Sequence, residues 1–69
     1  MERQSVASSN VAAIGYDAEG QVLEVEFLSG AVYQYASVPG DIFYLFTVAP
    51  SKGQFLNHVI KGRFSYRRV

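Results

Sequence analysis

Hydrophobic and polar residues alternate along the first half of the chain in a way that predicts three antiparallel strands. The clearest segment is 22–27 (VLEVEF), in which Leu23, Val25 and Phe27 face one side and the two glutamates face the other. Alternation with a period of two is typical of a strand with one buried and one solvated face. Segments 10–16 (NVAAIGY) and 31–36 (AVYQYA) are predicted as its neighbours, with a turn at 17–20 (DAEG).

The loop between the second and third of these strands determines where two tyrosines point. A two-residue loop would place Tyr33 and Tyr35 opposite the glutamates on the solvated face. A three-residue loop ending at Gly30 pairs Tyr33 with Val25 and Tyr35 with Leu23 instead. We favour the three-residue loop, because a glycine stands where this loop needs a left-handed residue. Both tyrosines are then expected on the core side of the sheet.

The second half of the chain predicts two short helices. The sheet ends at 38–41 (VPGD), and the continuous apolar run 42–49 predicts a short buried helix over roughly 40–49, ended by Pro50. A strand is the weaker alternative there, since β-branched residues are few. Ser51 and Gln54 have the spacing of a capping box for the second helix. Its apolar stripe is then formed by Phe55, Leu56, Val59 and Ile60.

The chain end and the chain start complete the expected fold. Gly62 suits the end of the second helix, and 64–69 (FSYRRV) alternates, which is compatible with an edge strand. Residues 1–9 are polar and patternless and are expected to form a flexible lead-in to a single domain over 10–69. The predicted fold class is therefore α+β: a three-stranded antiparallel meander, two short helices and a C-terminal edge strand.

Length and composition exclude several classes of protein. Sixty-nine residues provide one core, and five Phe and five Tyr supply enough apolar area to build it without cross-links. The chain has no cysteine, so disulfides, thiolate metal sites and cysteine nucleophiles are excluded. No apolar stretch reaches the length of about 18 residues that a membrane helix needs. We therefore expect a cytoplasmic protein with no membrane association.

Charge is segregated along the chain although the total is zero. Residues 1–50 contain six acids and one base, and residues 51–69 contain five bases and no acid. Such asymmetry suggests an acidic and a basic surface, of which the basic one could bind phosphate. The alternative is that the two halves pair with each other, or that the terminal arginines are merely solvated.

Catalytic chemistry has little support in the sequence. His58 is the only histidine and is predicted on the polar side of a helix. Glu24 and Glu26 project from one face of a strand, where a solvated role explains them better than acid–base catalysis. No phosphate loop, metal-ligand spacing or Ser-His-Asp set is present. We expect no enzyme activity, no metal, no cofactor and no small-molecule substrate.

Binding chemistry is better represented, at the C-terminal end. Bases are interleaved there with aromatic residues, and cations bind phosphate while aromatic rings stack on unpaired bases. The paired tyrosines of the third strand could form a second stacking platform, or could fill the core. The candidate nucleic-acid-binding residues are Lys61, Arg63, Arg67, Arg68, Tyr33, Tyr35 and Tyr66.

The order of several short motifs resembles the KTSC domain family. The motifs are SSN at 8–10, IGYD at 14–17, LEVEF at 23–27, GAVYQY at 30–35, VP at 38–39, APSKG at 49–53, FLN at 55–57, IK at 60–61 and YRRV at 66–69. The family is named for C-terminal regions of lysyl-tRNA synthetases and also includes short bacterial and phage proteins. The resemblance implies RNA as a partner and supplies no catalytic residue. Pro50 departs from the family pattern.

The sequence thus predicts a non-catalytic module that binds RNA, either tRNA-like or single-stranded. The alternative function is a protein-interaction or homodimerisation module. Its contact surface would be an exposed sheet edge or the apolar segment 42–46.

Overall fold

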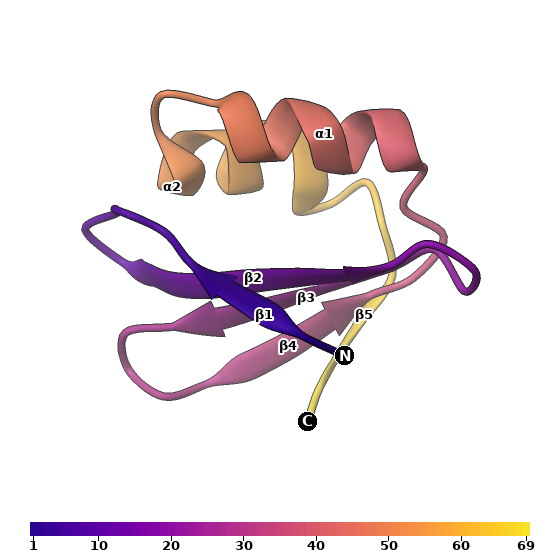
Figure 1. Cartoon of the computed structure of the whole chain (residues 1–69), viewed down its shortest axis with the longest axis horizontal. Helices are drawn as coiled ribbons and strands as arrows, with labels where there is room; N and C mark the ends of the chain where they lie inside the picture. Colours follow the sequence, from indigo (N-terminus) through magenta and orange to yellow (C-terminus); the bar gives the residue numbers. More distant parts are fainter.

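The predicted meander forms the centre of a five-stranded antiparallel sheet in the computed structural model, which describes all 69 residues (Figure 1). Its strands are β2 (Val11–Asp17), β3 (Val22–Phe27) and β4 (Val32–Tyr35). The strand order is β1-β2-β3-β4-β5, so each strand pairs with its neighbours in sequence. Strand β5 (Tyr66–Arg68) pairs with β4 and forms one edge, which confirms the expected C-terminal strand.

The register of the β3–β4 hairpin is the one that the three-residue loop predicts. Val25 pairs with Tyr33 and Leu23 pairs with Tyr35. Gly30 has a φ of 95°, in the left-handed region that favours glycine, and its N–H donates to the carbonyl of Phe27. Both tyrosines therefore lie on the face of the sheet that carries the core.

The other edge strand, β1 (Arg3–Ser5), was not predicted, because we expected a loose lead-in over residues 1–9. Its three residues are exposed and pair with β2, with Arg3 opposite Gly15. A Cβ atom on Gly15 would lie 2.7 Å from the carbonyl oxygen of Glu2 and 3.0 Å from Cγ of Arg3. Pairing with β2, rather than any local pattern, therefore gives this segment its conformation.

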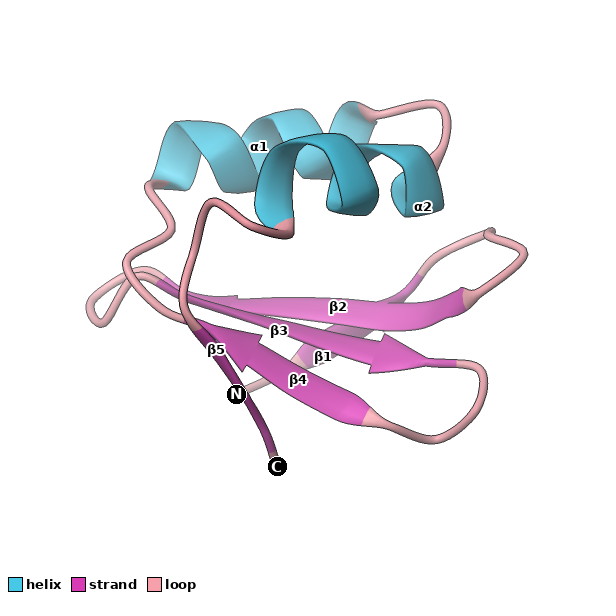
Figure 2. Ribbon diagram, turned by 180° about the vertical axis from the view of Figure 1, so that it is seen from behind, coloured by secondary structure: helices cyan, strands magenta, loops and turns pink.

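Two helical segments cover one face of the sheet, as Figure 2 shows, and leave the other face open. Helix α1 (Gly40–Val48) is followed by α2 (Lys52–Phe55), which continues into a π-helical turn, η1 (Leu56–Ile60). Ser51 caps α2 as predicted, since its hydroxyl accepts the N–H of Gln54 at 3.2 Å. Neither helical segment has the length and apolar content needed to span a membrane.

Helix α1 differs from the prediction of a buried helix. Only Phe46 is fully buried on it, whereas Tyr44, Leu45 and Val48 are about half exposed or more. A helix that covers one side of a sheet in a two-layer fold can bury only one face. The apolar run at 42–49 therefore supplies a core face and an exposed apolar face.

The core lies between the helices and the covered face of the sheet. Tyr16 donates a hydrogen bond from its hydroxyl to the carbonyl of Val38, and its ring stacks on Phe43 at 4.5 Å, which fixes α1 to β2. Phe46 stacks on Phe55 at 5.3 Å and joins the two helices. The fully buried residues are Val11, Ile14, Leu23, Val25, Tyr35, Val38, Phe46, Leu56 and Ile60.

Candidate nucleic-acid interface

Three aromatic rings form a continuous contact row at the end of the covered face that lies nearest β5. Tyr66 stands opposite Tyr35 in the β4–β5 ladder and leans diagonally onto Tyr33. The rings of Tyr33 and Tyr66 are parallel within 6°, with centroids 5.3 Å apart. Phe27 meets Tyr33 edge-on at 5.6 Å. Such diagonal contacts are usual for aromatic residues on neighbouring antiparallel strands.

The tyrosines of this region differ strongly in exposure. Tyr35 is 1% exposed and Tyr33 is half-buried, whereas Tyr66 is 62% exposed. One face of the Tyr66 ring is covered by Tyr33, and the ring is tilted by 42° to that of Tyr35 at a centroid distance of 5.6 Å. Tyr35 therefore offers no ring face to a ligand, and Tyr66 is the most exposed of the three tyrosines predicted to stack on bases.

Two of the predicted cations lie at this aromatic row. The ammonium nitrogen of Lys61 is 5.9 Å from the centroid of Phe27, within the range of a cation–π contact. Arg68 pairs with Tyr33 and is two residues from Tyr66, so it shares their face of the sheet. We call the surface formed by Phe27, Tyr33, Lys61, Tyr66 and Arg68 the aromatic–cationic patch.

The remaining two predicted cations are placed differently. Arg63 lies in the turn between η1 and β5 and is exposed. Arg67 points to the opposite face of the sheet, where its guanidinium donates to Oε1 of Gln34 at 3.2 and 3.4 Å. Adjacent arginines on one strand are thus separated by the sheet itself, because successive side chains point to opposite faces.

The open face of the sheet carries a polar row, in which the sequence placed Glu24 and Glu26 on one face but did not reveal that Arg3 joins them. Nε of Arg3 lies 3.2 Å from Oε2 of Glu24, and Nη1 of Arg3 lies 3.6 Å from Oε1 of Glu26. Gln34 donates to Oε1 of Glu24 at 2.8 Å and accepts from Arg67, so the row continues to β5. Glu24 is only 9% exposed, although it was predicted on a solvated face. The signal that could have revealed the row is Gly15, whose missing side chain leaves space for Arg3.

The acidic part of the chain and its basic C-terminal part form no ion pair with each other. Both ion pairs of the protein are made by Arg3, a base of the acidic half. No base of the C-terminal part lies in an ion pair, and Arg67 reaches Glu24 only through Gln34. Lys61, Arg63 and Arg68 therefore present their charges to solvent.

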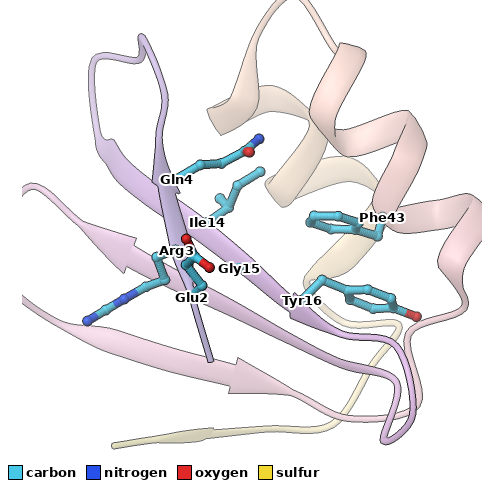
Figure 3. Close-up of a pocket in the computed structure, with 7 residues that line it drawn as sticks. All are labelled: Glu2, Arg3, Gln4, Ile14, Gly15, Tyr16 and Phe43. Atoms are coloured by element: carbon cyan, nitrogen blue, oxygen red, sulfur yellow. The ribbon is translucent and has the colours of Figure 1, made fainter.

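The protein also has surface hollows, and the largest lies away from the predicted residues. A groove of about 410 Å³ opens beside β1, between Gln4 and the stacked rings of Tyr16 and Phe43 (Figure 3). A second hollow, of about 360 Å³, is lined mainly by residues of the open face of the sheet, among them Val22, Gln34 and Arg67, and so lies on the opposite side from the patch. His58 lies on the exposed side of η1, and no group of His, Asp or Glu side chains is close enough to hold a metal ion.

Burial shifts the pKa of one tyrosine in this region. Desolvation raises the pKa of Tyr35 above its ordinary value, and the neighbouring Tyr33 and Tyr66 raise it further. The folded state then holds this proton more tightly than the unfolded state. Stability from this group is fully present below about pH 10 and falls as pH rises further.

We expect Tyr35→Phe to reduce the loss of stability at high pH. Its hydroxyl is in none of the side-chain hydrogen bonds of the protein and is not an unpaired buried group, so the variant should be close to wild type at pH 7. Urea unfolding of both proteins from pH 7 to 11 measures the difference. Parallel pH curves for the two proteins would show that Tyr35 does not carry the effect.

The fold and its surface define a small two-layer α+β domain with one open sheet face and an aromatic–cationic patch at its edge. The KTSC domain model matches residues 7–64, so the chain belongs to the KTSC domain family. This confirms the resemblance in the sequence. The crystal structure of a KTSC domain protein from Yersinia pestis is 43% identical and superimposes with a TM-score of 0.96, over 99% of this chain and 96% of that one.

The chain is similar both to a protein of its own length and to short segments of much longer proteins. An uncharacterised protein of Stutzerimonas stutzeri is 41% identical over the whole of this chain and 99% of its own length. A lysine–tRNA ligase of Nostoc punctiforme is 39% identical over 61 residues, which are 88% of this chain but only 11% of the ligase. The domain thus resembles both a free-standing small protein and a short segment of a much larger enzyme.

Proposed function

We propose that this KTSC domain is a non-catalytic RNA-binding module and that the aromatic–cationic patch is its contact surface. The observation that carries the proposal is Tyr66, whose exposed ring is held against Tyr33 on the same face as Arg68. Cations bind phosphate oxygens and aromatic rings stack on bases, so this combination suits a nucleic acid better than an apolar or acidic protein surface.

The charge distribution supports the same proposal. Lys61, Arg63 and Arg68 have no acidic partner, so binding of phosphate would not require an ion pair to break. The acids lie elsewhere: Glu24 and Glu26 are on the open face of the sheet with Arg3. Similarity to segments of lysine–tRNA ligases is consistent with an RNA partner.

We expect Lys61→Ala combined with Arg68→Ala to weaken binding of tRNA or single-stranded RNA about tenfold at low salt. The slope of log affinity against log salt should fall by about 1.4, because each lost phosphate contact on a single strand contributes about 0.7. Fluorescence anisotropy at low and moderate salt measures both quantities. No binding by the wild-type protein even at low salt would refute the proposal.

The matched control is Lys52→Ala combined with Arg67→Ala, which removes the same charge from outside the patch. Lys52 donates to the carbonyl of Ala49 at 2.7 Å, and Arg67 is bound to Gln34. This double variant should bind RNA within about threefold of wild type, since uniform charge effects are screened over about 10 Å at moderate salt. Equal losses in the two double variants would show that net charge, not the patch, determines binding. Light scattering on the same samples over a concentration series tests the alternative function, homodimerisation.

A further inference from the structure

We infer, on the basis of the proposed function, that the patch binds unpaired nucleotides and not duplex RNA, with one base stacked on the outer face of Tyr66. The ring of Tyr66 has one face against Tyr33 and lies tilted beside Tyr35, while its other face has no aromatic contact. A base on that face would continue the parallel stack of the two tyrosines. Tyr66 is 62% exposed, which leaves room for a base on that face.

The stacking ring is held in place before any ligand binds. Tyr33 supports Tyr66 at a centroid distance of 5.3 Å, and Phe27 supports Tyr33 edge-on at 5.6 Å. Lys61 lies beyond Phe27, and Arg68 stands opposite Tyr33, so cations are placed on two sides of the row. A ring that is already ordered loses little conformational freedom on binding, which favours affinity.

The size of the patch favours a few unpaired nucleotides. Strand β5 has three residues and spans about 10 Å, so the patch can contact only a few nucleotides. Domains that recognise double-stranded RNA by its shape span about 16 base pairs, far beyond this patch. The bases of a duplex are also paired and stacked inside it, so none could lie on Tyr66 except at a frayed end.

The experiment uses fluorescein-labelled hexa-adenylate as the single-stranded probe and a 12-base-pair RNA duplex as competitor. Loss of a base stack corresponds to about fivefold to 150-fold in affinity, so Tyr66→Ala should weaken hexa-adenylate binding at least fivefold. Tyr66→Phe keeps the flat ring and should bind within about twofold of wild type. The duplex should compete at least tenfold more weakly than unlabelled hexa-adenylate.

Two further variants separate stacking from other effects. Tyr66→Leu retains an apolar side chain that can pack on Tyr33 and maintain β5, so it should bind as weakly as Tyr66→Ala while remaining folded by circular dichroism. Tyr44→Ala removes a tyrosine of matched exposure, 64%, from α1 and should bind as wild type. Wild-type affinity in Tyr66→Leu, or equal competition by the duplex, would overturn the inference while leaving RNA binding intact. Absence of wild-type binding to both hexa-adenylate and tRNA would instead refute the proposed function and this inference with it.

Discussion

Phe46→Ala is expected to lower the free energy of unfolding by about 3–5 kcal/mol, the largest loss from any single substitution considered for this domain. Phe46 has no exposed surface and stacks on Phe55, so it joins α1 to the second helical segment above the sheet. A chain of 69 residues has a total stability of only about 3–10 kcal/mol. The variant should therefore be marginally folded or unfolded at room temperature.

Urea denaturation followed by circular dichroism measures this loss. The matched control is Leu45→Ala, at the neighbouring position on the same helix, because Leu45 is 49% exposed. We expect the control to lose less than about 1 kcal/mol, since much of its side chain already contacts water. Similar losses in the two variants would contradict the packing of α1 described above.

Glu24→Ala is expected to cost about 2 kcal/mol and to loosen β1. The carboxylate of Glu24 is nearly buried. It forms an ion pair with the guanidinium of Arg3 and accepts a hydrogen bond from the side-chain amide of Gln34. Hydrogen bonds to charged groups contribute about 1.5–3 kcal/mol. We place the total effect within the range of a single such bond, because the side chain of Arg3 is 34% exposed and can be hydrated after its partner is removed.

Glu26→Ala is the control for this prediction. Glu26 makes a longer contact with Arg3, 3.6 Å, and its side chain is 37% exposed, so its removal should cost less than about 1 kcal/mol. Hydrogen exchange of the amides that pair β1 with β2 gives an independent readout. Faster exchange there in Glu24→Ala but not in Glu26→Ala is the expected result, and unchanged exchange in both would show that the polar row does not hold β1.

The polar row and the aromatic–cationic patch lie on opposite faces of the same edge strand. Arg67 belongs to the row through Gln34, and Arg68 belongs to the patch through its position opposite Tyr33. Fixing Arg67 on the open face also fixes which way Tyr66 and Arg68 project. Comparing variants of Arg67 with variants of Arg68 therefore tests the β5 register as well as the binding surface.

Local sequence signals determined several elements of the fold, namely a strand, a hairpin loop and the start of a helix. Alternation at 22–27, Gly30 at the end of a three-residue loop and the Ser51 cap each depend on a few neighbouring residues, and each was predicted correctly. The stripe of the second helical segment was also predicted, since Leu56 and Ile60 are buried and Asn57 and His58 are exposed. Periodicity determines which residues share a face, and that property needs no distant contact.

Tertiary structure decided which of those faces meets solvent and which segments become edges. Alternation places Tyr33 and Tyr35 on one face of the sheet. The positions of the helices and of β5 then decide that Tyr35 is buried and that Tyr66 is exposed. The strand at Arg3–Ser5 and the near burial of Glu24 arise because Arg3 crosses Gly15, a contact between segments that are far apart in sequence. Alternation at 64–69 already separates Arg67 from Arg68, but only the pairing of β5 with β4 places Arg68 beside Tyr33 and Arg67 beside Gln34. Contacts between segments distant in the chain depend on the whole packing, so no local pattern could have determined them.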